Sequence, residues 1–440
     1  MTTRRRADLI VAMSGVGAVQ ADFDTPVDED TIDTAWAMTS DSYPNVSQEL
    51  DRILDCQQQD LVAIEVFRRM MRFDFDYEAD PLLTAIHLAY MMSVAAAPTG
   101  TPANQIERFT RGGGVSAGTW RIGVLVGNLV KFTQPLAWNA STASVKSALE
   151  NIAYIGKGNT SVSFTTDHWD VTLVNNWARG SITFSVDNAG LTGGTIVRTT
   201  QTAAAQNSHA LTRIVGFQPV SFGLVAGFRN SDKLPKFFKS CTANTLTLRA
   251  SHAQPRVTAN FGMIASGEVV RVTEDWEMPV CQVFRPARFR DTSLVIDGVD
   301  YALNNLLRDW ELSFSNNLIA DDDAYTAADE DIHRMERADQ RPFTINAGIL
   351  GEEGDTIHEM AESLAEVAVT MRVGRPGSNN TFTIPKAVLS LQNPVLGYDG
   401  TAKRSKVQIS IEPESIPGDA TTPFTATANV GLATQFLQAA

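Results

Sequence analysis

Apolar and polar residues alternate with a period of two along most of the chain, a pattern that predicts a protein built mainly of β-strands. Aromatic and charged residues take turns at positions 72–77, so one face of this strand is expected to be buried and the other charged. A helix is expected directly afterwards, because Asp80 can cap a helix, Pro81 suits its first position, and apolar residues at helical spacing continue to about Val94.

The same order of elements recurs in the second half of the chain. In each half an acidic loop is followed by a strand with buried aromatics, a capped helix, a hairpin and two closing strands. In the first half these elements are residues 22–33, 73–77, the helix after Asp80, 235–248 and 256–261 (RVTANF). In the second half they are, in the same order, residues 321–331, 342–347, the helix after Asp355, 385–391 and 406–411 (KVQISI). This repetition predicts two copies of one domain.

A shift in composition interrupts the first copy. Residues 119–202 are rich in Thr, Ser, Asn, Val and Gly, with short alternating runs and one helix signal at 144–152. The segment before them, 95–118, contains Pro98, Pro102 and three consecutive glycines, which are typical of a linker. We therefore expect an inserted β-rich domain that projects outward as a decoration.

The predicted fold class is mainly β with few helices: two sandwich or barrel domains, each with one flanking α-helix, plus the inserted domain. The length of 440 residues agrees with about three domains. The expected boundaries are 1–117 and 203–275 for the first domain, 118–202 for the insert, 276–414 for the second domain and 415–440 for a C-terminal arm. Because the arm has few charges and scattered apolar residues, we expect it to become ordered only on assembly.

The composition narrows the possible functions. Lys and Arg number 36 against 50 Asp and Glu, which gives a net charge of −14. Such a chain is poorly suited to gripping nucleic acid, because that binding depends on neutralising phosphates. No apolar run is long enough for a membrane span, and we expect no signal peptide. The three cysteines, Cys56, Cys241 and Cys281, form no CxxC pair and predict free thiols made in a reducing compartment.

Two loops hold much of the acidity. Their acidic residues are Asp22, Asp24, Asp28, Glu29, Asp30 and Asp33 in the first, and Asp321, Asp322, Asp323, Asp329, Glu330 and Asp331 in the second. One interpretation is that they are solvated loops, and the other is that they contact a neighbouring subunit or line a lumen. Arg285, Arg288 and Arg290 could bind phosphate, but in an acidic chain they more plausibly pair with such loops across an interface.

No arrangement of residues predicts catalysis. The six histidines form no HExxH motif, and residues 321–333 lack the glycine and spacing of a calcium loop. The glycine run at 112–114 is not followed by the Lys-Ser/Thr pair of a phosphate-binding loop. We expect a protein that is not an enzyme, with no catalytic residues, no metal site and no cofactor.

Outside the insert, the chain resembles the tail tube proteins of siphovirus-type, long-tailed bacteriophages. The resemblance is carried by residues 294–314, 334–347, 381–397 and 403–414, and by the first-half segments 233–248 and 256–267. Residues 127–164 and the LTGG of 191–194 resemble a small β repeat of phage and bacterial surface proteins, although HWDVTLVNN at 168–176 departs from its glycine-rich stretch.

This resemblance implies a structural virion protein. Six tail-tube domains would form a ring around a lumen, rings would stack with a long hairpin loop between them, and genomic DNA would pass through without specific binding during ejection. Two domains per chain favour a homotrimeric ring, with a hexamer as the alternative. Further partners would be the tail proteins at the tube ends, with no membrane. The protein would be made in the host cytoplasm and located in the virion. The alternative function is a tail-tip or host-surface binding module whose insert carries recognition.

Overall fold

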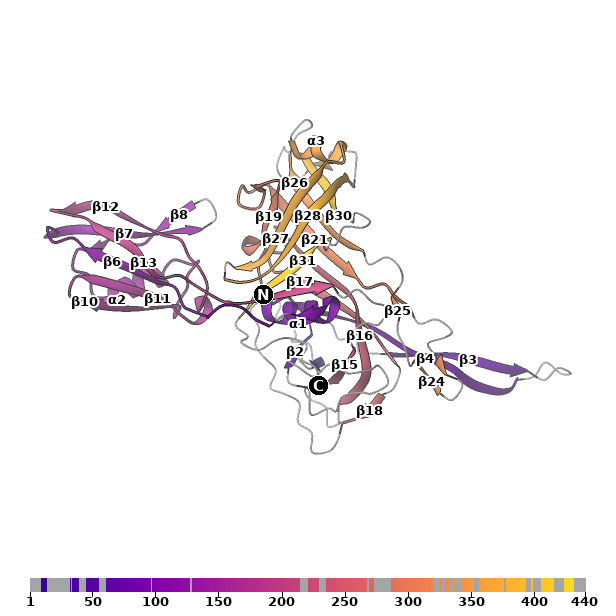
Figure 1. Cartoon of the computed structure of the whole chain (residues 1–440). Coiled ribbons are helices and arrows are strands. Elements are labelled where there is room, and N and C mark those ends of the chain that lie inside the picture. Colours follow the sequence, from indigo (N-terminus) through magenta and orange to yellow (C-terminus); the bar gives the residue numbers. More distant parts are fainter. Residues whose placement is uncertain are drawn as a thin grey trace.

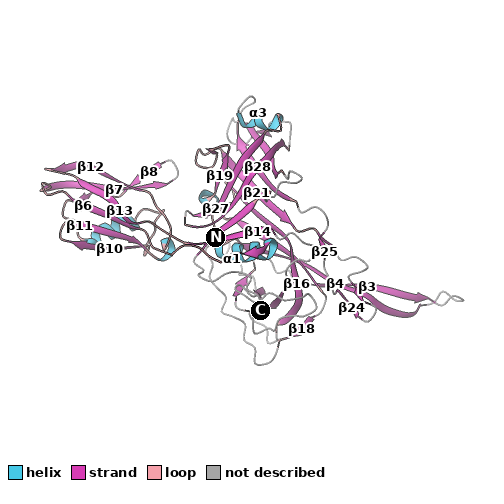
Figure 2. Ribbon diagram, viewed as in Figure 1, coloured by secondary structure: helices cyan, strands magenta, loops and turns pink. Residues whose placement is uncertain are grey.

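The computed structural model describes residues 9–13, 32, 34–38, 45–54, 61–95, 97–126, 129–213, 221–228, 235–266, 269–272, 286–319, 325–326, 329–332, 336–337, 342–351, 356–375, 377–392, 397–398, 405–414 and 423–430. The described chain is mainly β, as expected, with three α-helices (Figure 2). Two parts project from the body to opposite sides, namely the insert and a long hairpin formed by β3 (Asn45–Leu54) and β4 (Leu61–Glu78) (Figure 1).

The centre of the body is a continuous antiparallel sheet of eight strands. Each half of the chain contributes four. In pairing order they are β3 (Asn45–Leu54), β4 (Leu61–Glu78), β17 (Thr258–Ala265) and β16 (Lys236–Ser251), then β21 (Leu307–Ser315), β26 (Phe343–Leu350), β30 (Ser405–Pro413) and β28 (Ser378–Leu391). The pairing of β16 with β21 joins the halves, so we name this assembly the eight-stranded sheet.

Further strands form a second layer, because β16 and β28 are long enough to leave the eight-stranded sheet and pair again. β15 (Ser221–Phe228) pairs with the start of β16, and β27 (Glu366–Arg375) pairs with the start of β28. The layer is extended by β1 (Leu9–Met13), β2 (Thr34–Ala37), β18 (Val269–Arg271), β14 (Asn207–Arg213) and β5 (Ser93–Ala95), and by β19 (Ser293–Ile296), β20 (Val299–Asp300) and β31 (Thr425–Val430).

The strand pairing is duplicated down to its irregularities. Ser221 opens β15 opposite Thr242, and Glu366 opens β27 opposite Val388. Both ladders shift register after the next pair. At this shift one residue is left unpaired on β15 and two on β16, and likewise one on β27 and two on β28. Bulges are specific local features, so two ladders with the same bulge at the same place are equivalent structures. The pairing supports the predicted duplication.

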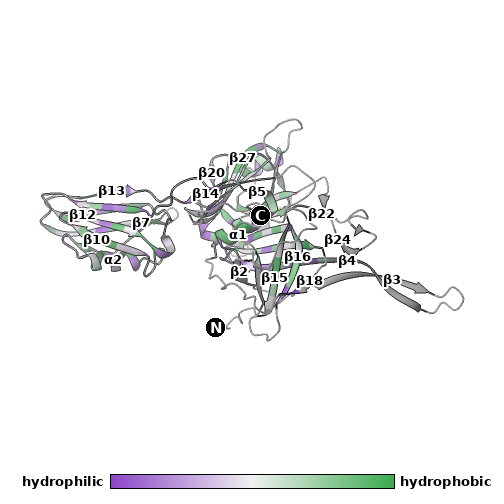
Figure 3. Cartoon of the chain, turned by 60° about the horizontal axis from the view of Figure 1, so that its bottom comes forward, coloured by the Kyte–Doolittle hydropathy of each residue, from purple (hydrophilic) through white to green (hydrophobic). Residues whose placement is uncertain are grey.

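Two helices pack on the apolar face of the eight-stranded sheet. α1 (Pro81–Met92) begins behind Asp80, whose carboxylate accepts a hydrogen bond from the Leu82 N–H at 2.8 Å, as the sequence predicts. α3 (Thr356–Glu362) occupies the equivalent place in the second half. Strands and helices of both halves bury their apolar residues in one common cluster. Figure 3 shows hydrophobic residues along α1, β15 and β16 of the body. The two halves therefore share a core.

The insert has its own core between two small sheets. One sheet has the order β10 (Thr160–Thr165), β11 (His168–Leu173), β6 (Ile106–Arg111), β13 (Ile196–Thr202). The other pairs β7 (Ala117–Val126) with β12 (Phe184–Thr192), β8 (Leu129–Phe132) and β9 (Leu136–Ala137). α2 (Thr142–Glu150) begins at the Ser141 cap, close to the predicted helix.

The predicted linker at 95–118 is wrong where β6 lies. Ile106–Arg111 pairs with both β11 and β13, and the Phe109 side chain is fully buried in the core of the insert. The insert thus begins before residue 118, and its base is marked by the paired bridges Thr99 with Ser208 and Ala103 with Ala205. The glycines that follow β6 belong to a turn and do not extend into the strand.

The predicted C-terminal arm is also wrong in its central part. β31 pairs with β14 on one side and with β28 on the other. Its alternate residues Ala426, Ala428 and Val430 are buried in the common core together with Phe424. Four apolar residues at strand spacing are enough to fix a short segment between two strands. Residues 415–422 and 431–440 lie outside the described part.

Short elements complete the described chain. They are β22 (Leu318–Ile319) paired with β25 (Glu336–Arg337), β23 (Tyr325–Thr326) paired with β24 (Asp329–Ile332), β29 (Gly397–Tyr398) on β30, and the 3-10 turns Asn175–Trp177 and Phe289–Asp291.

Candidate lumen face and assembly edges

Among the side chains that the structure describes, one face of the eight-stranded sheet is mostly polar from β4 to β28. Residues that point away from the core pair in register from strand to strand. One such row runs through seven strands: Glu78, Thr258, Arg249, Glu311, Asn346, Ser410 and Ser390. A sheet that is apolar on one face and polar on the other separates a core from water. We call this surface the polar face.

Among the side chains that the structure describes, the polar face carries more acid than base. Its charged residues are the acids Asp74, Asp76, Glu78, Asp309, Glu311 and Glu412 and the bases Arg72, Arg249 and Lys406. The sequence indicated this in the alternating run at 72–77, whose outer face was expected to be charged. These acids lie on strands, whereas the acids predicted to be functional lie in two loops.

Hydrogen bonds hold many of these side chains flat on the sheet. The Asn260 amide donates to Asp76 at 3.0 Å, and the Gln392 amide donates to the Asn346 side-chain oxygen at 2.7 Å. Asp309 accepts from Gln408 at 3.3 Å and lies 2.5 Å from the Lys406 ammonium. Burial, and then the charge of Asp76, raise the pKa of Asp74. A braced polar face of this kind presents a fixed pattern of charge.

The junction between the halves is held by more than its strand ladder. Asn316, which is fully buried, donates from its amide to the Met91 carbonyl at 3.1 Å and to the Ala243 carbonyl at 2.9 Å. The amide of Asn380 likewise donates to the Pro81 carbonyl at 2.9 Å. These bonds fasten the ends of α1 to the second half, so the position of the halves relative to one another is specific.

Both ends of the eight-stranded sheet are open edges in the described part of the chain. β3 pairs with β4 alone, and Ser390–Gln392 at the end of β28 pairs with β30 on one side only. An open edge exposes a row of unpaired N–H and C=O groups and is a template for another strand. The sheet therefore ends in two surfaces that can pair.

The two acidic loops are not equivalent, which corrects the expectation that they match. Residues 22–33 lie between β1 and β2, where the second half has only the turn Asp297–Gly298 between β19 and β20. Residues 321–331 lie between β21 and β26, where the first half has the tip of the β3–β4 hairpin. The likeness of composition misled because it carries no information on strand order.

Three of the twelve predicted loop acids belong to a described strand. Asp22, Asp24, Asp28, Glu29, Asp30, Asp33, Asp321, Asp322 and Asp323 lie outside the described residues. Asp329, Glu330 and Asp331 belong to β24, a strand that contacts β4 of the first half. The structure thus brings the described end of the second acidic loop to β4, and the role of both loops stays a prediction.

Of the predicted interface arginines, Arg290 is engaged within the chain, whereas Arg285 lies outside the described residues. The guanidinium of Arg290 lies 3.9 Å from Asp291 and 5.4 Å from the ring of Tyr154 in the insert. Arg375 similarly lies 3.8 Å from Asp291 and 4.9 Å from the Trp177 ring. Burial raises the pKa of Asp291 despite the nearby charges of Arg375, Arg290 and Arg288. This cluster fixes the base of the insert against the second half.

A cleft of about 490 Å³ lies beside this cluster, between insert and second half. Leu125 and Ile182 of the insert line one side, and Leu303 and Arg372 line the other. The described residues contain no group of three or more His, Cys, Asp or Glu side chains that could hold a metal ion there or elsewhere.

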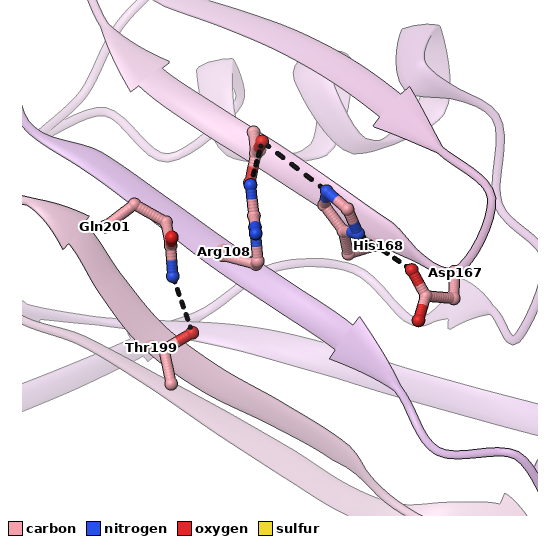
Figure 4. Close-up of polar contacts among 6 residues, drawn as sticks. Arg108, Asp167, His168, Thr199 and Gln201 are labelled. Atoms are coloured by element: carbon pink, nitrogen blue, oxygen red, sulfur yellow. Dashed lines mark hydrogen bonds and ion pairs between the residues drawn. The ribbon is translucent and has the colours of Figure 1, made fainter.

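The outward face of the β6 sheet carries a small ionic network (Figure 4). Arg108 donates two hydrogen bonds to Asp170, at 2.8 and 2.9 Å, and this pairing lowers the pKa of Asp170. His168 lies 2.8 Å from Asp167 and 3.7 Å from Asp170. Because Arg108 and Asp170 stand directly opposite each other on neighbouring strands, the network braces the sheet.

The histidine on α1 belongs to the core. His87 is fully buried between Trp36 and Phe261, and the Tyr77 hydroxyl lies 2.5 Å from its Nδ1. Burial lowers the pKa of His87 to about 3, so the ring is neutral and accepts this bond. Burial also raises the pKa of the Cys241 thiol, the cysteine that the structure describes. Cys56 and Cys281 lie outside it.

Comparison with known proteins gives no family for the chain: no protein-family model matches it, and no curated protein matches it significantly. Among the described helices, none is both long and apolar enough to span a membrane. The geometry of the sheet is therefore the basis for any functional proposal.

Proposed function

We propose that the chain is a structural subunit of a bacteriophage tail tube, in which copies join into a ring around a lumen. The observation that carries the proposal is the eight-stranded sheet itself. It consists of two equivalent four-stranded parts joined edge to edge, and each of its two ends is an open edge among the residues that the structure describes. Edges that differ from each other join head to tail, and such contacts close into rings when the rotation permits.

The polar face supports this assignment as the lumen surface. Closing the sheet on itself places one face inside and the other outside, and both α1 and α3 occupy the apolar face. The polar face would then line the lumen with an excess of carboxylates. Carboxylates repel the phosphates of DNA, so DNA can slide past without adhering.

The long hairpin supports the stacking of rings. β4 has 18 residues, of which only the C-terminal part, from Met71 to Glu78, pairs with β17. The rest pairs with β3 and projects from the body on the side away from the insert (Figure 1). A projecting hairpin with its own open edge is suited to contact the next ring in a stack.

Electron microscopy of the purified full-length protein tests the proposal. We expect rings, or hollow tubes with a regular repeat, and three chains per ring by native mass measurement, because each chain supplies two equivalent parts. Six chains per ring would refute the trimer alone. A protein that remains monomeric at high concentration and forms neither rings nor tubes would refute the proposed function.

A charge reversal tests the lumen. Tubes with Asp76→Lys and Glu311→Lys should retain short duplex DNA at low salt, measured by fluorescence anisotropy, whereas unmodified tubes should not. Asp167→Lys combined with Asp187→Lys, two acids of the insert, is the charge-matched control and should bind no more DNA than the unmodified tube. Equal DNA binding by the lumen variant and the control would show that the polar face does not line the lumen.

A second candidate function is recognition of a host surface by the insert. β8 is an edge strand whose Leu129, Val130 and Phe132 are 63%, 43% and 46% exposed. Exposed apolar side chains grouped on one strand favour contact with another molecule. Quantitative mass spectrometry of particles distinguishes the functions, because a tube subunit is present in many rings and a tip module in one.

A further inference from the structure

We infer the register in which two copies of this chain join: the end of β28 pairs antiparallel with the start of β3 of a second copy, Val46 opposite Leu391 and Asn45 opposite Gln392. This inference rests on the proposed function and specifies its interface. It derives from the duplication of the strand ladders, because the chain already contains one junction between equivalent halves.

The first step is the equivalence of β16 and β28. Leu246 pairs with Phe261 of β17, and Leu391 pairs with Ile409 of β30. β17 and β30 correspond, because Thr258 pairs with Glu78, the last residue of β4, and Lys406 pairs with Leu350, the last residue of β26. From these residues each strand runs seven residues further, to Ala265 and to Pro413. Leu391 therefore occupies the place of Leu246.

The second step is the equivalence of β3 and β21. Phe314 pairs with Phe343 near the start of β26, and Val46 pairs with Met71 of β4. Met71 and Phe343 are equivalent, since each lies seven residues before the matching strand ends Glu78 and Leu350. Val46 therefore occupies the place of Phe314.

The third step applies the junction inside the chain to the junction between chains. Within the chain Leu246 pairs directly with Phe314, and Thr247 pairs with Ser313. Substituting the equivalent residues gives Leu391 with Val46 and Gln392 with Asn45. In the described part of the chain both segments are open on the edge that this pairing needs.

Space for the new strand follows from the same comparison. β15 pairs with β16 only as far as Thr242, and β21 takes the same edge from Thr245 onward. β27 pairs with β28 only as far as Val388, which leaves the edge from Ser390 onward for the strand of another copy. The two edges end at equivalent places.

Cysteine cross-linking between two chains tests the register. One chain carries Asn45→Cys and the other Gln392→Cys, both with Cys56→Ser and Cys281→Ser, and the chains are mixed, assembled and oxidised. A second mixture uses Val46→Cys with Leu391→Cys, because adjacent antiparallel pairs alternate between close and wide spacing. We expect a disulfide-linked heterodimer on a non-reducing gel in at least one mixture.

The matched control is Ser47→Cys mixed with Gln392→Cys, which is two residues out of register. The Cα atoms of the two cysteines would be about 7–8 Å apart, beyond the range that a disulfide spans. Cross-linking of rings in the control mixture would overturn the register while leaving the proposed function intact. Rings that form but cross-link in none of the three mixtures would have the same consequence. Absence of rings in the unmodified protein would refute both.

Hydrogen exchange on the unmodified protein gives a second measurement that requires no variant. On assembly, amides within 45–47 and 390–392 should exchange more slowly, because they donate hydrogen bonds in the new ladder. Protection of α3 alone, with no change at these two segments, would overturn the inference.

Discussion

The two helices show what the halves of the molecule have in common and where they differ. α1 is buried along its whole length except at Leu82, because it contacts β28 and β31 of the second half as well as β16 of its own. α3 contacts β28 of its own half and leaves Thr356, Glu359 and Glu362 exposed. Equivalent elements with unequal burial indicate that α3 lacks the neighbour that α1 already has within the chain.

The comparison extends to the loop after each helix. In the second half Ser363–Ala365 leads directly from α3 to β27, and Leu364 there is 58% exposed with a positive φ of 51°. In the first half the same place holds the strands β5 and β14 and the entire insert. One copy of the fold thus carries at this point a domain that the other omits.

The largest expected effect is the difference between two deletions that make the first half resemble the second. Deleting residues 104–204 and joining Ala103 to Ala205 through Asn-Gly should leave a soluble protein that still assembles, because these alanines already pair through two backbone hydrogen bonds of 3.1 and 3.0 Å. Soluble yield and electron microscopy measure the outcome. Deleting 119–202 instead should abolish soluble expression, since it removes both partners of β6.

Substitutions at two equivalent core positions, one in each half, should differ in how much they lower the free energy of unfolding. Phe75 and Ala347 are equivalent, being opposite Phe261 and Ile409, and both are fully buried. Phe75→Ala should lower the free energy of unfolding by about 3–5 kcal/mol, because it leaves a cavity. Ala347→Gly, the control, should cost about 1 kcal/mol. Equal losses in thermal or denaturant unfolding would show that Phe75 fills no more of the common core than Ala347 does.

The buried histidine makes stability depend on pH. The pKa of His87 is about 3 in the folded chain and near 6.5 when exposed, so the unfolded state takes up the proton first as the pH falls. The contribution of His87 to stability should therefore be fully present above pH 6.5. As the pH falls from there to about pH 3, the free energy of unfolding should decrease by about 1.4 kcal/mol per pH unit.

His87→Phe is the matched variant for this test. It should be less stable at pH 7, because the Tyr77 hydroxyl loses its acceptor, and it should lose less stability between pH 6.5 and pH 4. Denaturant titrations at several pH values measure both slopes. Identical slopes for the two proteins would show that another group dominates the acid response.

The smallest effect is expected at Leu364. Leu364→Gly relieves a left-handed backbone conformation, so the isolated chain should gain up to about 1 kcal/mol or remain unchanged. If α3 and its loop meet a second copy, the same change should weaken ring assembly, seen as a higher protein concentration at half assembly. Leu364→Met, which keeps an apolar side chain, should assemble normally; equal assembly by both variants would exclude this contact.

Strand register is where the sequence comparison between the halves failed. The segments 256–261 and 406–411 align end to end, but the pairing matches Thr258 with Lys406, two residues out of step. A shift of two keeps every side chain on its own face of the sheet, so the apolar pattern cannot detect it. Only the partner strands fix which of the allowed registers is used.

The alternation of residues by itself determined that this is a mainly β protein, that α1 follows its strand at Asp80, and that the outer face of 72–77 is charged. These features depend on neighbours in the chain, whose spacing the sequence states directly. The tertiary structure decided that β6 belongs to the insert, that Thr425–Val430 is a core strand, and that acids on distant strands gather on one polar face. Those outcomes depend on backbone hydrogen bonds between segments far apart in the chain, and any strand can offer such bonds to any other.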